Sequence, residues 1–437
     1  MSRFPIGDER KVVMSIFDLD IYRATRELVR NPLTMQRARR WIRPLASVLL
    51  AATSCARADV VTDSNARAAE IASKLPGTPP AVRAMAIVQV SVFEAANVIT
   101  RRYPDSSRVK VMAPSGASLD AAVFAATRTA LLKLVPAQQA AIDADYQAAL
   151  RLLPDSREKS DGIAVGEQVA TAVFEACASD RAVAPNTYRP HGAAGAYVPT
   201  TSPAVPHWGS RRPWNMTSGD QFRPGPPPSL TSEVWKRDLE EVKTFGAMNG
   251  SKRSVEQSAI AKFWEATAPV VYWPVARSVS NASGRDITDN ARFLAVAAMA
   301  MDDALIAVFD AKYTYNFWRP VTAIRNTEGA GRDAGWLPYV DTPMHPEYPC
   351  AHCIVSAALG AVLQAEIGKG PTPALTSSST TANGAIRTWS TVGDFTQEVS
   401  MGRIYDGVHY RNSTEVGRTM GQKIGELAVT SLPKATP

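Results

Sequence analysis

Two histidines and two cysteines surround a Tyr-Pro pair in the segment HPEYPCAHC, residues 345–353. Histidine and cysteine are the residue types that bind metals, move protons and carry out redox chemistry. Apolar residues at three- and four-residue spacing follow, which predicts a helix over 351–367. Pro349 suits the start of that helix. Residues 350–352 are therefore expected in its first turn, where free backbone N–H groups and the helix dipole favour an anion.

The segment KYTYNFWRP, residues 312–320, carries two long cationic side chains. Lys312 and Arg319 are seven residues apart, which on a continuous helix gives one face and a Cα separation of about 10.5 Å. Pro320 disfavours helical geometry at Arg319, so a break in the helix there is an alternative. The two cations can converge on one small anion, although two separate exposed cations are the simpler interpretation of this segment alone.

A third segment, GRIYDGVHYRN at residues 402–412, contains Arg403 and, six residues later, His409. Asp406 and a glycine interrupt the pattern before the next helix, so His409 is expected near a helix start or in a loop. The chain has five histidines, and three of them fall in these segments. Histidines gathered with lysine and arginine favour an oxyanion site.

Zinc binding and redox chemistry are two other uses of HPEYPCAHC. Two cysteines and two histidines can hold zinc tetrahedrally, but four ligands within nine residues close awkwardly around one ion, and the nearby cations disfavour it. Cys350, at a helix start, has the placement of a reactive thiol in a Cys-x-x-Cys redox site, yet the βαβ pattern of a thioredoxin-like fold is missing around it. Both remain weaker alternatives to an anion pocket.

In order and spacing, Lys312-x6-Arg319-Pro320, Pro349-Cys-Ala-His352 and Arg403-x5-His409 resemble the three-part signature of the vanadium-dependent haloperoxidase and type-2 phosphatidic acid phosphatase superfamily. The longer segments DAKYTYNFWRPVTAI and GRIYDGVHYRN are similar to the haloperoxidase-type members. The resemblance implies an all-α fold, a helical bundle of the vanadium haloperoxidase and acid phosphatase type, here with a long Pro-rich loop.

The resemblance also implies which groups hold the oxyanion, either vanadate or phosphate. Lys312, Arg319 and Arg403 match the family's cationic positions, and the backbone N–H of Ala351 matches the position of its glycine donor. Cys350 stands where the family usually has a serine. A thiol donates a weaker hydrogen bond than a hydroxyl and is oxidised by peroxide.

Three catalytic candidates follow from the same resemblance: Lys312, His352 and His409. His409 matches the histidine that bonds vanadium, or that attacks phosphorus in the phosphatases, and His352 matches the acid–base histidine. The residues serve a vanadate-dependent oxidation of bromide or iodide, rather than chloride, by hydrogen peroxide. They equally serve hydrolysis of a phosphate ester through a phosphohistidine, with phosphate as substrate and no cofactor. An inactive oxyanion-binding module is a third possibility.

Three more residues are assigned by their positions relative to the signature. His345 corresponds to the halide-pocket position, where histidine resembles the bromoperoxidase type, and Phe309 can line the same pocket. Asp406 is the candidate for the carboxylate that supports His409, because Ser413 stands where the family commonly has an aspartate. A loop residue, a core residue and a turn residue are the respective structural alternatives.

The composition is that of a folded protein with a slight excess of positive charge. The chain has 437 residues, of which 45% are hydrophobic and 20% charged, and a formal net charge of +7. This length and composition allow a large buried core. No basic block interleaved with aromatic residues occurs, so nucleic acid is not an expected partner. The oligomeric state is not predicted.

The N-terminal region resembles a secretory signal peptide. Residues 35–58 comprise an arginine-rich start, a short apolar stretch and Ala-Arg-Ala before Asp59. We expect cleavage after Ala58 and a periplasmic or secreted location. Residues 1–34 are expected to be a non-native extension, with translation beginning at Met35.

Helical periodicity dominates the remainder of the chain. It predicts an N-terminal helical part over 59–184 and a catalytic helical bundle over 232–437, joined by a Pro- and Trp-rich loop over 185–231 that wraps a surface or covers a site. Two adjacent aspartates interrupt the apolar run 291–309, which favours a buried core helix over a membrane span. The predicted helices cover 80–98, 118–134, 138–152, 160–178, 232–246, 254–267, 288–311, 351–367 and 412–431.

Overall fold

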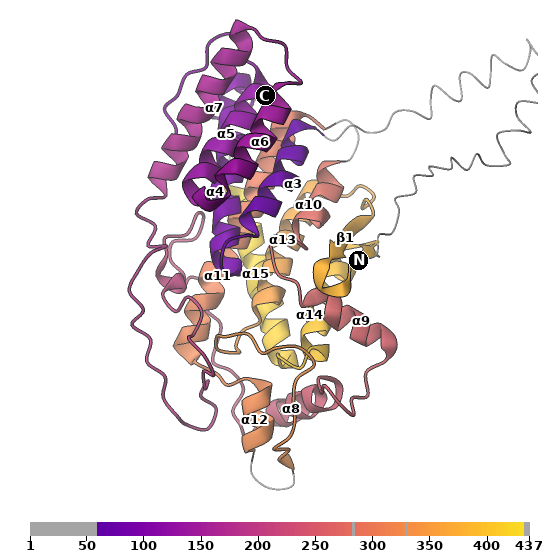
Figure 1. Ribbon diagram of the computed structural model, residues 1–437. Helices are drawn as coiled ribbons and strands as arrows, with labels where there is room; N and C mark the ends of the chain where they lie inside the picture. The colour runs from indigo at the N-terminus through magenta and orange to yellow at the C-terminus, as the bar shows by residue number, and fades with distance from the viewer. Residues whose placement is uncertain (1–58, 282–284, 328–330, 432–437) are drawn as a thin grey trace, which may run out of the picture. The chain divides into compact units, whose positions relative to one another are not determined.

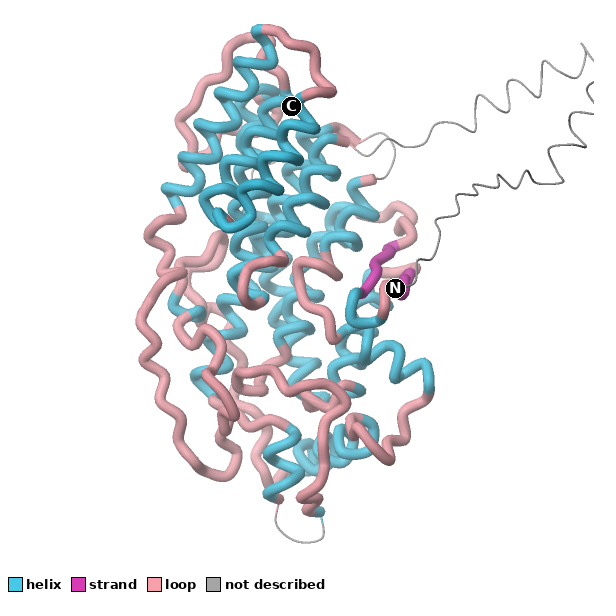
Figure 2. Tube along the Cα trace, in the orientation of Figure 1, coloured by secondary structure: helices cyan, strands magenta, loops and turns pink. Residues whose placement is uncertain are grey.

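The structure is a computed structural model that describes residues 59–281, 285–327 and 331–431. The signal peptide and the extension predicted for residues 1–58 lie outside the described residues. The described residues belong to one compact unit. Its regular structure is almost entirely helical, with one short hairpin (Figure 2). The expected all-α fold is confirmed.

Every helix predicted from the sequence is present, and Figure 1 shows their arrangement. The helices over residues 60–72, 273–280, 320–326 and 392–405 and the two-stranded antiparallel sheet were not predicted. In chain order the elements are α3 (Val60–Ala72), α4 (Thr78–Thr100), α5 (Leu119–Leu134), η1 (Pro136–Gln138), α6 (Gln139–Leu150), α7 (Arg157–Ala176), η2 (Trp208–Ser210), α8 (Glu233–Phe245), α9 (Val255–Trp264), α10 (Trp273–Ser280), α11 (Ile287–Tyr315), α12 (Pro320–Asn326), α13 (Ala351–Ile367), β1 (Leu375–Ser379), η4 (Thr380–Ala382), β2 (Ala385–Trp389), α14 (Val392–Tyr405) and α15 (Arg411–Ser431).

Helix α11 is the centre of the packing. It contacts α4 on the N-terminal side of the chain and α13 and α15 on the C-terminal side. Its side chains are buried around most of its circumference, which explains why the run 291–309 is apolar without a polar face. The predicted buried core helix is therefore present. Among the described helices, α4 is the one long and apolar enough to cross a membrane, and 83% of that apolar window is buried inside the protein.

Two adjacent aspartates within α11, Asp302 and Asp303, hold the Pro- and Trp-rich loop in place. Asp302 accepts a hydrogen bond of 2.8 Å from Arg211, and Arg211 also contacts Asp180 at 2.7 Å. Asp303 accepts hydrogen bonds from the backbone N–H groups of residues 214 and 215, at 2.7 and 2.9 Å. Because these carboxylates are buried, the loop is fixed across the helix at defined points.

Helix α11 ends before Arg319, so the alternative of a break is the correct one. Asn316 takes the left-handed conformation with φ 49°, and its N–H donates to the carbonyl oxygen of Lys312 at 2.8 Å. Arg319 is extended and precedes Pro320, the first residue of α12. Lys312 and Arg319 therefore come from two elements and do not share one helix face.

Glycines allow α15 to approach α13 closely. A Cβ atom added at Gly417 would lie 2.7 Å from the carbonyl oxygen of Cys350, and one at Gly421 would lie 2.1 Å from that of Ile354. Residues four apart lie on one helix face, so these glycines form a smooth strip against α13. The contact brings the start of α15, directly after His409, next to the start of α13.

Candidate oxyanion site

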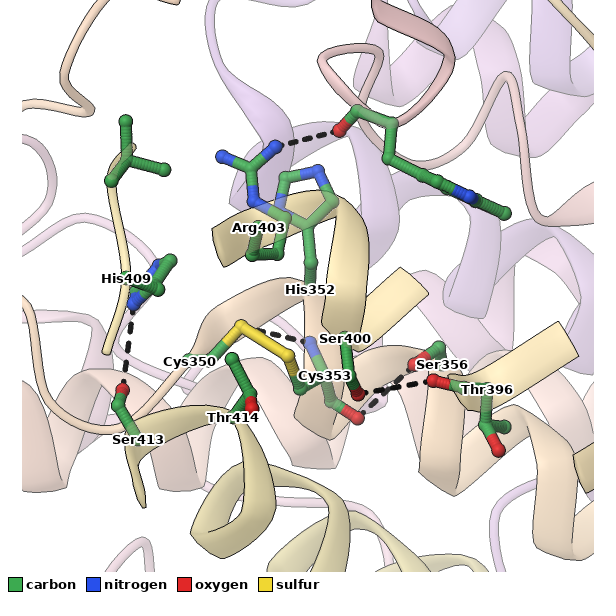
Figure 3. Close-up of a disulfide and its surroundings, with 12 residues drawn as sticks. Cys350, His352, Cys353, Ser356, Thr396, Ser400, Arg403, His409, Ser413 and Thr414 are labelled. Atoms are coloured by element: carbon green, nitrogen blue, oxygen red, sulfur yellow. Dashed lines mark hydrogen bonds between the residues drawn. A yellow bond between two sulfur atoms is a disulfide. The ribbon is translucent and has the colours of Figure 1, made fainter. Parts of the chain in front are cut away.

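The residues singled out by the sequence come together where five segments meet. Lys312 lies in the last turn of α11, Arg319 precedes α12, and Arg403 lies in the last turn of α14. His352 lies in the first turn of α13, and His409 is in the connection between α14 and α15. Figure 3 shows Arg403, His352 and His409 gathered above the first turn of α13.

Lys312 and Arg319 are fully buried cations. The ammonium group of Lys312 donates to the carbonyl oxygens of Pro346 and Glu347 at 2.9 and 2.7 Å. Arg319 donates to the carbonyl oxygens of His345 and Val408 at 2.9 and 2.8 Å. Burial, and then the neighbouring arginines, hold the pKa of Lys312 well below its ordinary value. Burial likewise lowers the pKa of Arg319 to about 10.

Arg403 supplies a third buried cation with a free donor. One of its terminal nitrogens donates to the carbonyl oxygen of Trp264 at 2.7 Å, and the guanidinium forms an ion pair with Asp406. The Nε–H of Arg403 is buried and has no partner among the described residues. A buried donor without a partner is costly, so this group favours an acceptor in the space beside it.

The imidazole of His409 is held in one orientation by Glu347. Its Nδ1 lies 2.6 Å from Glu347 Oε1, which also accepts the backbone N–H of Tyr410 at 3.1 Å. A carboxylate partner assigns the proton to Nδ1, which leaves the lone pair on Nε2. That Nε2 atom lies 3.2 Å from an Arg319 nitrogen. Burial, and then Arg319 and Lys312, keep the pKa of His409 well below its ordinary value.

The prediction that Asp406 supports His409 is wrong. Asp406 is three residues after Arg403 at the end of α14, and this spacing turns its carboxylate toward Arg403. The carboxylate that supports His409 is Glu347, which was not predicted from the sequence although it lies inside HPEYPCAHC. Glu347 is the only acidic residue in that segment, and this feature of the sequence could have identified it. Ser413 Oγ is 3.4 Å from His409 Nδ1 and is a weaker second contact.

The first turn of α13 presents Ala351 and His352. The backbone N–H of Ala351 has no hydrogen-bond partner among the described residues, as expected of a first-turn donor. His352 Nε2 lies 3.2 Å from the carbonyl oxygen of Ala266. Burial, and then Arg403, lower the pKa of His352 well below its ordinary value. His352 is therefore neutral at neutral pH while no anion is bound.

The expected role of Cys350 as an oxyanion donor is contradicted. Cys350 forms a disulfide with Cys353, so its sulfur carries no proton to donate. The sulfur instead accepts the N–H of Cys353 at 3.2 Å as the N-cap of α13. No cluster of three or more potential metal ligands occurs in the described part of the chain, so zinc binding by this segment has no geometric support there.

The two halide-pocket candidates contact each other beside Arg319. The rings of Phe309 and His345 meet edge to face, with centroids 5.2 Å apart. His345 Nδ1 lies 2.9 Å from an Arg319 nitrogen. Arginine has no acceptor, so Nδ1 accepts and the proton of the neutral ring is on Nε2.

Comparison with known proteins adds independent information. Residues 292–435 match the family model of the VCPO second helical-bundle domain. The crystal structure of a bacterial vanadium-dependent iodoperoxidase is similar to this chain, with a TM-score of 0.75 and 25% identity, over 87% of this chain and 97% of that one. These findings support the predicted resemblance to the vanadium haloperoxidase superfamily.

Other vanadium haloperoxidases share the fold at lower identity. The holo-type structure of a bacterial vanadium-dependent chloroperoxidase has a TM-score of 0.66 and 18% identity, over 82% of this chain and 94% of that one. Its apo-type structure covers 79% of this chain, with a TM-score of 0.65. No curated protein sequence matches the chain.

The donors at the site fit the oxyanion that the superfamily implies. Three buried cations, Lys312, Arg319 and Arg403, face two buried carboxylates, Glu347 and Asp406, which leaves an excess of positive charge. The free Nε–H of Arg403 and the free N–H of the first turn of α13 are the donors that a tetrahedral oxyanion accepts from. Vanadate and phosphate share this chemistry, so the residues present fit either ion.

Proposed function

We propose that the protein is a vanadate-dependent haloperoxidase that oxidises bromide or iodide with hydrogen peroxide. The observation that carries the proposal is the orientation of His409. Its Nδ1 is fixed on Glu347, and its Nε2 lone pair is directed to the side where Arg319 lies. This is the arrangement that a histidine needs in order to bond an electrophilic centre inside a cationic site.

The residues of the chain have separable tasks in this proposal. Lys312, Arg319 and Arg403 hold the oxyanion and balance its charge. The first turn of α13 donates its free N–H group, and His352 moves a proton there because a bound dianion raises the pKa of a neighbouring histidine toward neutrality. Vanadate, when bound, supplies the activation of hydrogen peroxide for a two-electron oxidation of halide.

The preference for bromide or iodide is supported by the two rings beside Arg319. Phe309 and His345 meet edge to face there, and His345 is neutral because burial and then Lys312 hold its pKa well below the ordinary value. A large, weakly hydrated halide loses less hydration free energy beside such rings than chloride does. The similarity to an iodoperoxidase agrees with this preference.

A peroxide-dependent halogenation assay tests the proposal. Purified protein is loaded with orthovanadate, and bromination and iodination of a phenol dye are measured with and without hydrogen peroxide. Halogenation is expected to require vanadate and peroxide and to be lost in His409→Ala. The matched control is His207→Ala, because His207 Nε2 bonds only the carbonyl oxygen of Ala182 in the loop, at 3.1 Å.

The alternative activities give different results in the same experiment. Hydrolysis of a phosphate ester that is inhibited by vanadate and lost in His409→Ala would identify an acid phosphatase acting through a phosphohistidine. Binding of vanadate without either activity would identify an oxyanion-binding module. We further propose a periplasmic or secreted location; detection of a mature chain that begins at Asp59 would test it.

A further inference from the structure

A disulfide encloses the anion-binding turn of α13. Cys350 and Cys353 are joined (Figure 3), and Ala351 and His352 lie between them in the sequence. Both cysteines are fully buried. The two enclosed residues are those assigned to the oxyanion, one through its backbone N–H and the other through its imidazole. The covalent ring therefore restrains the backbone of the two residues that carry these groups.

The same ring is linked to the segment that carries His409. The N–H of Cys350 donates to the carbonyl oxygen of Ser413 at 3.2 Å, and Ser413 Oγ lies 3.4 Å from His409 Nδ1. A Cβ atom added at Gly417 would lie 3.2 Å from Cys353 Cβ. With α15 packed this closely on the disulfide, a change in the first turn of α13 alters the distance between its N–H donors and His409.

We propose that Cys350 and Cys353 form a peroxide-reactive redox site whose oxidation state sets the affinity of the neighbouring oxyanion site. The inference rests on the proposed function in one respect, which is that peroxide is a substrate at this site. It concerns a role of the two sulfur atoms that is separate from holding the anion directly.

The chemistry of the pair balances with peroxide as the oxidant. A sulfur atom of the reduced pair attacks one peroxide oxygen, the O–O bond breaks, and a sulfenic acid and one water form. The other thiol attacks the sulfenic sulfur, the S–O bond breaks, and the disulfide and a second water form. Two thiols and one hydrogen peroxide thus give one disulfide and two waters. The adjacent partner thiol competes with further oxidation of the sulfenic acid.

The disulfide form is the one that binds the anion more tightly. The first turn of a helix lacks intrahelical partners for its N–H groups and loosens readily, and the ring removes that freedom at Ala351 and His352. A donor held in place before binding costs less conformational entropy when the anion arrives. Reduction restores an S–H group at Cys350, but a thiol is a weak donor and does not offset this loss.

Cys177 provides an internal control. It is a free cysteine at the end of α7, outside the site, and burial raises the pKa of its thiol to about 11. Among the described residues it has no second free cysteine to pair with, so peroxide cannot form a disulfide there. A redox response of the oxyanion site should therefore persist in Cys177→Ser and disappear in the double variant Cys350→Ser, Cys353→Ser.

The test uses the full chain in two redox states. One sample is treated with a phosphine reductant and the other with hydrogen peroxide, both are desalted, and the state of the 350–353 peptide is read by alkylation and mass spectrometry. Calorimetry then measures the affinity for orthovanadate and, separately, for inorganic phosphate. We expect the oxidised sample to bind both ions about tenfold more tightly, and peroxide to restore the disulfide and the affinity.

Three results would overturn the inference. They are a disulfide that survives the reductant in the folded protein, thiols that peroxide fails to rejoin, and equal or higher anion affinity in the reduced sample. Absence of anion binding in both states would overturn it together with the assignment of the site. A redox-dependent affinity without halogenation would leave this inference standing and refute the haloperoxidase proposal, because calorimetry and peptide mapping do not depend on turnover.

Discussion

Glu347 Oε1 lies 2.6 Å from His409 Nδ1, and both side chains are buried within the protein. Burial raises the pKa of the Glu347 carboxyl to about 7, while Lys312 and Arg319 act in the opposite direction. The total charge of Glu347 and His409 therefore depends on whether an anion is bound at the site. A bound dianion neutralises the cations, and the contact then fixes both the tautomer and the basicity of His409.

The substitution Glu347→Gln should reduce halogenation more than folding. Glutamine keeps the size of the side chain and an acceptor oxygen, but it removes the negative charge that sets the basicity of His409. Loss of such a supporting partner costs about 10- to 100-fold in activity or metal affinity. The measurements are halogenation kinetics and orthovanadate affinity by calorimetry.

The matched control is Glu366→Gln. Glu366 lies near the end of α13 and pairs with Arg285 at 2.6 Å, away from the first turn of that helix. Glu366→Gln should change the halogenation rate and the orthovanadate affinity by less than about twofold, because partly exposed ion pairs contribute little. Equal effects of the two substitutions would show that Glu347 has no special relation to His409.

Replacing Lys312 with methionine should separate stability from anion binding. Burial holds the pKa of Lys312 well below its ordinary value, so near neutral pH this amine lowers the stability of the native state relative to the unfolded chain. Lys312→Met removes that cost and keeps an unbranched side chain. We expect an unliganded protein at least as stable in urea as the parent, with orthovanadate affinity lowered about tenfold or more.

Lys243→Met is the control for this experiment. The ammonium of Lys243 donates to the carbonyl oxygen of Gly331 at 2.9 Å, and this residue is partly exposed on α8. Loss of this ammonium group should change neither the stability in urea nor the orthovanadate affinity appreciably. If Lys312→Met bound orthovanadate as tightly as the parent, Lys312 would not belong to the oxyanion site.

The fold and the cationic residues could be predicted from the sequence because each rests on local information. Helical periodicity and turn signals depend on residues that are close together in the sequence, and three short motifs in a fixed order identify the segments that meet. Their meeting depends on tertiary packing. Pro320 indicated a break after α11, but only the structure shows that Asn316 ends the helix and lets Arg319 turn back toward Lys312.

The errors concern choices among neighbours that spacing does not decide. Asp406 and Glu347 are both carboxylates within the motif segments, and the directions of their side chains decide which one reaches His409. Cys350 is at the expected helix start, yet the covalent state of its sulfur depends on Cys353, one helical turn later. Neither the direction of a side chain nor its redox state follows from residue type.

The stability of the protein should depend on pH through Asp303. Burial raises the pKa of this carboxyl from 3.8 to about 7, although backbone hydrogen bonds from Trp214 and Asn215 lower it. Between those values the native state binds more protons than the unfolded chain, so this group makes the free energy of unfolding fall as pH rises.

Asp303→Asn tests this dependence directly. The two backbone N–H groups bond different oxygens of Asp303, so asparagine keeps an acceptor for only one of them. Asparagine does not titrate, so the contribution of this position to the slope disappears. The difference in unfolding free energy, variant minus parent, should rise by about 1 kcal/mol or more between pH 5 and pH 8 in urea titrations. A difference that is constant across this range would contradict the raised pKa of Asp303.

Arg211 should be a determinant of stability because it joins the loop to two buried carboxylates. Its guanidinium contacts Asp302 at 2.8 Å and Asp180 at 2.7 Å, and all three side chains are buried. Without Arg211, Asp180 keeps Arg83 as a partner. Asp302 loses its cation and keeps the indole N–H of Trp214 as a partner. Removing one partner of a buried ion pair in a medium of low polarity costs about 3–5 kcal/mol. Arg211→Met is therefore expected to lower the free energy of unfolding by this amount, measured in urea.

The neighbouring Arg212 supplies the comparison for that measurement. Arg212 is exposed and its side chain contacts only the carbonyl oxygen of Ala176, so Arg212→Met should cost less than about 1 kcal/mol. Orthovanadate affinity measured in the folded fraction should be unchanged in Arg212→Met. A loss of stability in Arg211→Met no larger than in Arg212→Met would mean that Arg83 and Trp214 are sufficient partners for Asp180 and Asp302.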